Sequence, residues 1–202
     1  MSNDQRTEII KAAGEMFFRL GIRSVSIDDI CHELGMSKKT FYVYFGSKDE
    51  LIDQLLQANI DYMSAKMDAL LNAEDFRQVA KGLVKHCHEI GTNGDVRRVP
   101  QLVYDLKKYY SRQFEEFQHK SFEQHKNHIA LLLERGVANG FVRANLNIDL
   151  TSTILAKIYT DMLRDFEQTE ARGRNVMQLL HAAMDICIRG VLNEEGLKLY
   201  EE

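Results

Sequence analysis

The sequence predicts an all-α protein. Apolar residues recur at helical spacing along almost the whole chain of 202 residues, and alternating strand-like runs bounded by turn signals are missing. Pro100 is the only proline, so little in the chain interrupts helical hydrogen bonding. Hydrophobic residues form 45% of the chain and charged residues 28%, close to the average of globular domains, which predicts folding around an apolar core.

Three helices and the start of a fourth are expected in the first fifty residues. The first covers residues 4–20 and ends at Gly21. Ser26, with Asp29 three residues later, can cap a short second helix that ends at Gly35. A serine oxygen accepts the free N–H groups of a helix start, and glycine tolerates the backbone that ends a helix.

Ser37 marks the start of the third helix, expected over residues 38–45. Ser47 and Glu50 form a Ser-x-x-Glu capping box, which predicts a long connecting helix that continues to about residue 71. Two short helices joined by a glycine turn are typical of the helix-turn-helix, whose second helix enters the DNA major groove.

The remainder of the chain predicts about five more helices, with the clearest breaks at residues 92–95 and 139–140, where Asn and Gly occur together. We therefore expect a helix-turn-helix domain over residues 1–50 and a larger helical domain over residues 51–202. The later helices are expected near residues 73–91, 98–119, 121–139, 150–170 and 174–193.

The distribution of charge points to a local DNA contact. A net charge of −4 excludes a protein that coats nucleic acid through overall charge, since such proteins are strongly basic. From Met36 to Lys48, however, the chain has three lysines, several hydroxyl side chains and no acid. This acid-free segment predicts a compact cationic surface on the third helix and its flanks.

The side chains of this surface can be divided by what they offer to DNA. Lysine can donate to guanine acceptors and valine can contact a thymine methyl, so we expect Lys38, Lys39 and Val43 at the base edges. Hydroxyl and ammonium groups hold phosphates. The residues expected to position the DNA backbone are Ser26, Ser37, Thr40, Tyr42, Tyr44 and Lys48.

Three runs of sequence carry a resemblance to a known family: SIDDI at residues 26–30, GMSKKTFYVYF at 35–45 and SKDEL at 47–51. Together they resemble the TetR/AcrR family of bacterial transcription regulators over about residues 7–56. The resemblance implies a dimer that binds a palindromic operator, habitually as a repressor. It also implies that a small-molecule effector among the middle helices displaces the connecting helix, re-spaces the two heads and releases the DNA.

The chain departs from the family pattern at a few positions. Cys31 stands where the family usually has alanine, Tyr44 where it often has histidine, and Lys39 near a usual glycine, arginine or proline. A tyrosine can still donate one hydrogen bond to a phosphate, but the operator sequence cannot be inferred from a relative. Asp28 is expected to complement the positive end of its helix.

The last two expected helices are apolar over unusually wide arcs. A four-helix bundle formed by two copies of the chain would bury the surplus, and burial within one chain's core is the alternative. The residues expected at such a dimer interface are Ile154, Ile158, Met162, Phe166, Leu180, Met184, Cys187 and Val191.

Aromatic side chains cluster in the middle helices, where they are either ordinary core or the lining of a pocket for an apolar or aromatic effector. The candidates for ligand contact are Tyr104, Tyr109, Phe114, Phe117 and Phe122.

Two other classes of function remain open. Metal sensing would draw on His86, Cys87 and His88, or on a second group formed by His119, His125 and His128. These spacings match no compact metal motif, and we expect neither a metal nor a cofactor.

A helical adaptor for other proteins would explain the amphipathic helices but not the acid-free segment. No phosphate-binding glycine loop or nucleophile elbow is present, so we do not expect an enzyme.

Composition also predicts where the protein acts. No apolar run approaches the ~20 residues of a membrane-spanning helix, and the polar start lacks a signal-peptide core. Three cysteines, Cys31, Cys87 and Cys187, are far apart and odd in number, which favours a reducing compartment. We therefore expect a cytoplasmic protein that does not bind membranes.

Overall fold

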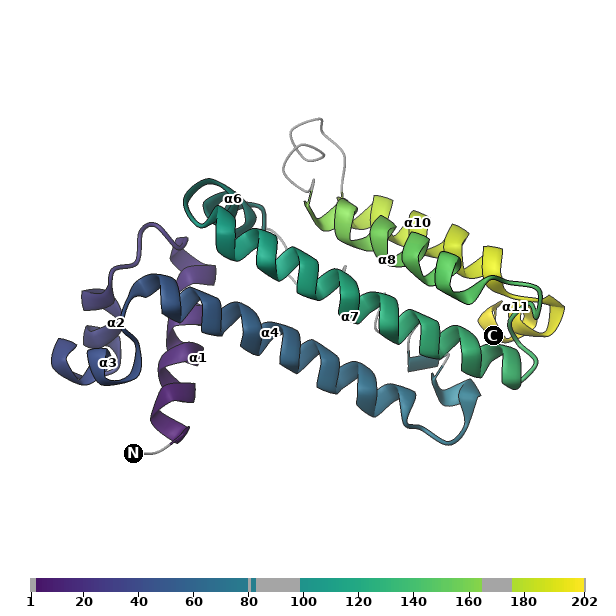
Figure 1. Ribbon diagram of the computed structural model, residues 1–202, viewed down its shortest axis with the longest axis horizontal. Coiled ribbons are helices and arrows are strands. Elements are labelled where there is room, and N and C mark those ends of the chain that lie inside the picture. Colours follow the sequence, from purple (N-terminus) through teal and green to yellow (C-terminus); the bar gives the residue numbers. More distant parts are fainter. Residues whose placement is uncertain (1–2, 80, 83–98, 165–175, 202) are drawn as a thin grey trace. The chain divides into compact units, whose positions relative to one another are not determined.

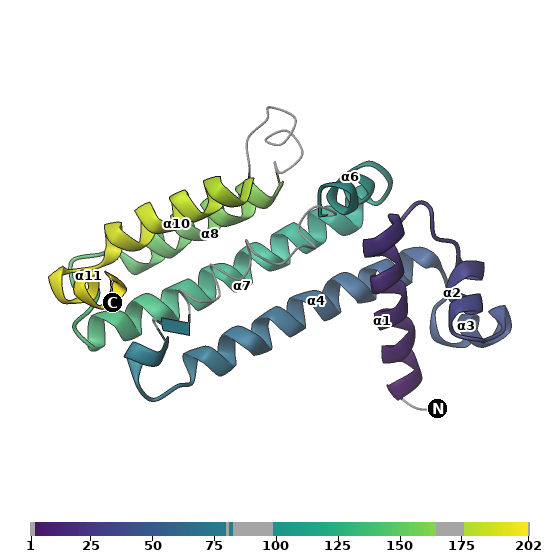
Figure 2. The same ribbon diagram turned by 180° about the vertical axis from the view of Figure 1, so that it is seen from behind.

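The computed structural model describes residues 3–79, 81–82, 99–164 and 176–201 (Figures 1 and 2). Within these ranges the regular structure is helical, with a single isolated bridge between Val142 and Leu192. The all-α prediction is therefore confirmed. None of the described helices combines the length and apolar character needed to cross a bilayer.

The chain divides into two compact units. The first consists of Met1–Tyr62 and Arg97–Phe117, and the second of Met63–Val96 and Gln118–Glu202. The first unit thus adds a segment from the middle of the chain to the N-terminal helices. The expected division after residue 50, between a DNA-binding and a ligand-binding part, remains a prediction about function.

The first unit contains the expected N-terminal helices close to their predicted limits. The helices are α1 (Asn3–Leu20), α2 (Ile27–Glu33), α3 (Lys38–Tyr44), α4 (Lys48–Leu71), α6 (Val99–Tyr109) and α7 (Ser111–Ala138). Residues 48–62 of α4 and 111–117 of α7 belong to this unit, together with the whole of α6.

One apolar core holds the first unit together. Ile9 of α1, Ile30 of α2, Phe41 of α3 and Leu51 of α4 have no exposed surface. Side chains of α6 and α7 join the same core, including Phe114 at 6% exposure. Burial of a large apolar side chain is worth about 1.5–3 kcal/mol, so this shared core is the main stabilisation of α2 and α3.

Gly35 produces the turn between α2 and α3. Its φ is +60°, a left-handed conformation that costs little only for glycine. Just after it, Met36 N–H returns to the Cys31 carbonyl at 2.9 Å, which closes the end of α2. Cys31 is 5% exposed, and burial raises the pKa of its thiol, in keeping with a packing role.

The α2 cap follows the predicted pattern. Ser26 Oγ accepts the Asp29 N–H at 3.2 Å, and Asp29 Oδ2 in return accepts the Ser26 N–H at 2.7 Å. The Ser26 hydroxyl also donates to Asp29 Oδ2 at 2.6 Å. These hydrogen bonds, first that of the side chain and then that of the backbone of Ser26, hold the pKa of Asp29 below its ordinary value.

The α4 cap differs from a standard capping box in one bond. Ser47 Oγ accepts the Glu50 N–H at 3.1 Å, as expected. The Glu50 carboxylate, however, reaches one residue further back and accepts the Gly46 N–H at 2.8 Å. The cap therefore fixes the turn between α3 and α4 as well as the start of α4.

The break expected at Lys120, between helices at 98–119 and 121–139, is wrong. α7 continues through this position, and the chain instead bends at Tyr110, between α6 and α7. Tyr110 keeps both backbone bonds, donating to the Leu106 carbonyl and accepting from the Phe114 N–H, each at 2.9 Å. The bend therefore leaves no backbone group of Tyr110 unpaired, while no glycine or proline interrupts the helix near Lys120.

The second unit packs the rest of α7 with α8 (Ile148–Arg164), α10 (Val176–Val191) and α11 (Glu194–Glu201). Helices α8 and α10 lie side by side (Figures 1 and 2). Gly140, with φ +76°, ends α7 at the predicted Asn-Gly break.

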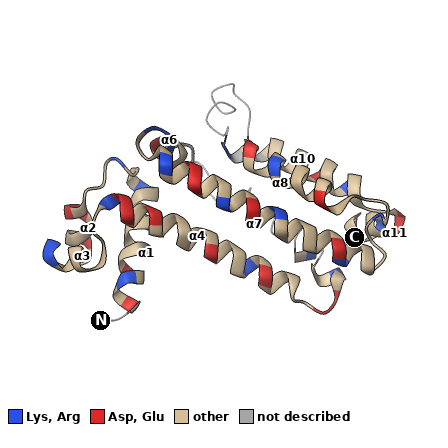
Figure 3. Ribbon diagram, in the orientation of Figure 1, with Lys and Arg blue, Asp and Glu red and all other residues tan. Residues whose placement is uncertain are grey.

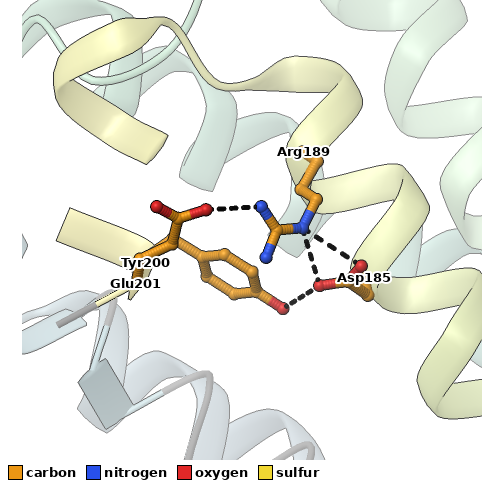
Figure 4. A network of polar contacts seen from close by, with 4 residues as sticks. All are labelled: Asp185, Arg189, Tyr200 and Glu201. Carbon is orange, nitrogen blue, oxygen red and sulfur yellow. Dashed lines mark hydrogen bonds and ion pairs between the residues drawn. The ribbon is translucent and has the colours of Figure 1, made fainter. Parts of the chain in front are cut away.

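The C-terminal helix α11 was not expected from the sequence. Asn193 caps it, since Asn193 Oδ1 accepts the Gly196 N–H at 2.9 Å. Arg189 of α10 then pairs with Glu201 at 2.7 Å and with Asp185, whose carboxylate also accepts from the Tyr200 hydroxyl (Figure 4). The signal for this helix was an Asn followed by two acids in the first turn.

Replacing Gly35 with Ala should lower the free energy of unfolding by about 1–2 kcal/mol, because the left-handed backbone is unfavourable for alanine. A Cβ at this position would meet no atom within 4 Å, so steric contact adds nothing to this effect. Gly190 is the matched control. It also has open space around a Cβ but lies in α10, so Gly190→Ala should stabilise by up to ~1 kcal/mol. Urea unfolding followed by circular dichroism measures the free energy of unfolding of both variants. Equal destabilisation by Gly35→Ala and Gly190→Ala would contradict this account.

Replacing Ser26 with Ala should return the pKa of Asp29 toward its ordinary value, measurable by NMR titration of the carboxyl carbon. A depressed carboxyl pKa adds stability above about pH 3.9 that is lost as pH falls through the lower folded value. The stability difference between wild type and Ser26→Ala should therefore shrink on acidification through that range. Ser24→Ala, an exposed serine outside the cap, should leave the Asp29 titration unchanged.

Candidate nucleic-acid interface

The outer face of α3 is a cationic and aromatic surface. Lys38, Lys39, Tyr42 and Val43 are all exposed, with 52% of Tyr42 and 53% of Val43 accessible, whereas Phe41 on the inner face is fully buried. Acids are absent from α3 and are found on α2 instead (Figure 3). The structure thus brings the predicted base-edge residues together on one exposed face.

Arg6 of α1 braces the end of α3, a contact that sequence reasoning missed. Its guanidinium donates to the Tyr44 carbonyl at 3.0 Å, lies 4.7 Å from the centre of the Phe45 ring and pairs with Glu50 at 3.5 Å. These partners are about forty positions away along the chain, so no local pattern could have identified them. The contact pairs one of the free C-terminal carbonyls of α3, that of Tyr44.

Several predicted phosphate-binding hydroxyls already have partners within the first unit. Ser37 Oγ accepts the Thr40 N–H at 3.1 Å and lies 2.9 Å from the Thr40 hydroxyl. The Tyr44 hydroxyl donates to Gln5 Oε1 at 3.0 Å. Ser26 is engaged in the α2 cap. These hydroxyls therefore support the helices that carry the surface, whatever further contacts they make.

Lys38 points toward α2, where its ammonium lies 2.7 Å from Asp28 Oδ1. Both side chains are 60% exposed. At such exposure an ion pair contributes little to stability, since water screens it. Asp28, expected only to complement its helix start, thus also contacts the base-edge candidate.

Lys48 is directed into the protein. Its ammonium donates to the carbonyls of Ile22 and Val25, each at 2.5 Å, and lies 5.3 Å from the centre of the Phe17 ring. Burial lowers the pKa of Lys48, and Asp105 is the largest of the nearby charges that oppose this shift. Two of its three N–H donors are therefore used by the loop between α1 and α2.

The aromatic residues expected to contact an effector do not share one environment. Phe114 and Phe117 pack into the core of the first unit, and Phe122 is half-buried in the second. The Tyr109 hydroxyl accepts from Arg23 at 2.9 Å, and the Tyr104 hydroxyl accepts from Lys108 at 2.7 Å. Their roles toward a ligand stay predictions.

The residues expected at a dimer interface also differ in exposure. Leu180 is 2% exposed and so already belongs to the core of a single chain, whereas Ile154 is 58% exposed. Two exposed residues were not in the expected set: Leu150 at 58% and Ile186 at 71%. Phe166 lies outside the described residues. The remaining expected residues, Ile158, Met162, Met184, Cys187 and Val191, are half-buried.

The histidines considered for metal binding make other contacts. His128 Nε2 lies 3.0 Å from Asp68 Oδ1, and His125 Nδ1 lies 2.6 Å from the Ser121 carbonyl. Across the described part of the chain, no three His, Cys, Asp or Glu side chains are grouped closely enough to hold a metal ion. The expected trio at residues 86–88 lies outside the described residues.

Residues 9–55 match the family model described as bacterial regulatory proteins, tetR family. Among curated relatives, the transcriptional repressor KstR2 of Mycobacterium tuberculosis is 24% identical over 149 residues, which cover 73% of this chain and 74% of that protein. The transcriptional activator FasR of Mycolicibacterium smegmatis is 32% identical over 84 residues, 41% of this chain and 38% of that protein.

A solved TetR-family regulator from Cytophaga hutchinsonii has a TM-score of 0.69 to this chain, with 12% identity over 96% of this chain and 98% of its own. At that identity the likeness shows the fold alone. The curated relatives are transcription regulators and not enzymes, in line with the sequence-based expectation. The residues matched by the family model contain the helix-turn-helix formed by α2 and α3, and the chain belongs to the TetR family of bacterial DNA-binding transcription regulators.

Proposed function

We propose that this protein is a dimeric, effector-responsive repressor that binds a palindromic operator through the outer face of α3. The observation that carries the proposal is the exposed, acid-free face formed by Lys38, Lys39, Tyr42 and Val43 on a helix whose other side is locked into a core. A rigid helix that presents cations and an apolar side chain suits the major groove. Repression is proposed because the relative KstR2 is a repressor, whereas the relative FasR is an activator of transcription.

Within this proposal the residues have separate tasks. Lys39 and Val43 contact base edges, and Lys38 joins them when it leaves Asp28. Tyr42 donates to phosphate, as does whichever of the paired Ser37 and Thr40 hydroxyls does not donate to the other, at the positive end of α3. Ser26 and Tyr44 already donate their single hydroxyl protons to Asp29 and Gln5, so each must leave that partner to donate to a phosphate. Lys48 keeps one N–H beyond the two that bind loop carbonyls.

A dimer is proposed because a palindromic operator needs two heads at a fixed spacing. Support comes from Leu150 and Ile154 on α8 and Ile186 on α10, three large apolar side chains that are more than half exposed on helices that pack side by side. Large apolar side chains exposed on neighbouring helices are typical of interaction surfaces. A second copy of the chain, joined through the same helices, would bury them in a four-helix bundle.

An apolar or aromatic small molecule is proposed as the effector. KstR2 of Mycobacterium tuberculosis, whose structure is solved, is a ketosteroid transcriptional regulator, and an apolar ligand would suit the aromatic middle helices of this chain. Binding would displace α4 and change the spacing of the two heads. A ligand-bound structure whose head spacing equals that of the DNA-bound state would contradict this step.

Replacing Lys39 with Ala should change the preference among DNA sequences, at a cost of about 1–3 kcal/mol on the preferred one, because a base-edge contact is lost. Fluorescence anisotropy against the gene's upstream DNA and a scrambled duplex, at several salt concentrations, measures affinity and preference together. Lys66→Ala, an exposed lysine of α4, is the control and should change neither. Wild-type protein that binds neither duplex at low salt would contradict the proposed function.

The same titrations distinguish two roles of Lys48. If it binds a phosphate, Lys48→Met should reduce the slope of log affinity against log salt by about one contact. If it acts only through the loop carbonyls, affinity should fall for all sequences while the slope stays that of wild type. An effect on preference alone would contradict both roles.

Replacing Ile186 with Asp should convert the dimer into a monomer and weaken operator binding, because a buried charge without a partner costs several kcal/mol. Analytical ultracentrifugation measures the molar mass. Leu131→Asp, a change of the same kind at a 43% exposed position on α7, should remain dimeric. Retention of the dimer in Ile186→Asp and Ile154→Asp alike would exclude this face as the interface.

A further inference from the structure

The loop between α1 and α2, residues 21–25, is held by two charged side chains from other helices of the first unit. Asp105 of α6 is 3% exposed, and its Oδ2 accepts the backbone N–H of Arg23 at 3.2 Å. Lys48 of α4 donates to the carbonyls of Ile22 and Val25, each at 2.5 Å. The loop is thus bound by an anion on one side and a cation on the other.

Both charges act on the same peptide group. The Ile22 carbonyl and the Arg23 N–H belong to one peptide unit, and in a trans peptide these two groups point in opposite directions. The carboxylate of Asp105 lies at the positive end of this peptide dipole, and the ammonium of Lys48 lies at its negative end. We refer to Asp105, Lys48 and the Ile22–Arg23 peptide group as the peptide clamp.

Burial of the Asp105 carboxylate is compensated by hydrogen bonds to both of its oxygens. A buried carboxylate is unfavourable unless its oxygens are bonded, and the second oxygen of Asp105 accepts from Gln101 Nε2 at 3.0 Å. The loop also approaches Asp105 very closely, since a Cβ on Gly21 would lie 3.2 Å from Asp105 Oδ2. Gly21 has a φ of +84°, so glycine satisfies both the close approach and the backbone conformation.

The clamp directly precedes the helix-turn-helix. Val25, whose carbonyl Lys48 binds, is followed by Ser26, the cap of α2. Because α2 has only seven residues, its start is set by this cap and by the loop that leads into it. Helix α6, outside the N-terminal fifty residues, is thereby connected through Asp105 to the loop that leads into α2.

We propose that Asp105 is a positioning residue for DNA binding, which fixes the Ile22–Arg23 peptide group together with Lys48 and thereby sets the position of α2 and α3. Asp105 is buried and need not touch DNA. The inference rests on the proposed function, in which the outer face of α3 contacts the operator.

The test replaces Asp105 with Asn and uses Asp53→Asn as the matched control. Asp53 of α4 pairs with Arg112 of α7 at 2.9 Å in the same unit, and its side chain is 34% exposed. Both changes remove one negative charge, so general attraction to phosphates rises equally in the two variants. The probe is a DNA duplex selected by the wild-type protein from a random-sequence library, and the readouts are its Kd, the salt slope and the melting temperature.

Simple electrostatics and the clamp predict opposite results. Asp53→Asn should bind the selected duplex as tightly as wild type or slightly more tightly. Asp105→Asn should bind about tenfold more weakly, with the wild-type salt slope, because no phosphate contact is removed. Lys48→Met should also weaken binding, and the double variant should lose clearly less than the product of the two single losses, since both residues act on one peptide group.

Amide hydrogen exchange gives a readout that does not need DNA. The amide of Arg23 and those of α2 should exchange faster in Asp105→Asn than in Asp53→Asn. If Asp105→Asn does not fold, Lys48→Met tests the carbonyl side of the clamp by the same two measurements. Binding and exchange in Asp105→Asn equal to those of Asp53→Asn would overturn the inference. Wild-type protein that selects no sequence would overturn the proposed function, while exchange would still show whether the clamp exists.

Discussion

The shortness of α2 and α3 is the constraint on which the rest of the structure depends. Each has seven residues, well below the length at which an isolated helix is stable in water. Their order must therefore come from outside: from the core that buries Ile30 and Phe41, and from the side chains that close their ends. The exposed face of α3 can be rich in cations because it contributes nothing to that core, while its opposite face supplies the required burial.

Local signals predicted the N-terminal helices well. Serine caps and glycine turns act within three or four residues, so Ser26, Ser37 and Gly35 identify the limits of α2 and α3 from sequence alone. The bend at Tyr110 was missed for the converse reason. It leaves all backbone bonds of that residue in place and is marked by no glycine or proline, so only the packing of the surrounding core reveals it.

The candidate site was predicted in part. Exposure on α3 follows from helical periodicity around Phe41, and the structure agrees with it. The partners of Lys48, Lys38 and Arg6 could not be predicted, because each contact joins separate helices or a distant loop. The sequence predicts that Lys48 binds the DNA backbone, which would also offset the unfavourable position of a lysine in the first turn of a helix. The structure offers two loop carbonyls instead, which shows how a local anomaly can be explained by a partner inside the protein.

The ion pair between Lys38 and Asp28 changes what binding at this lysine would release. When a lysine neutralises a DNA phosphate, cations condensed on the DNA are released, and this release makes protein–DNA affinity depend on salt. Here Asp28 serves as the lysine's own counterion, attached to the same head. The proposed transfer of Lys38 to a DNA phosphate would therefore exchange one anion for another and leave Asp28 to solvent. Loss of this internal ion pair would offset a small part of the gain from a contact between Lys38 and DNA, because both side chains are exposed to water.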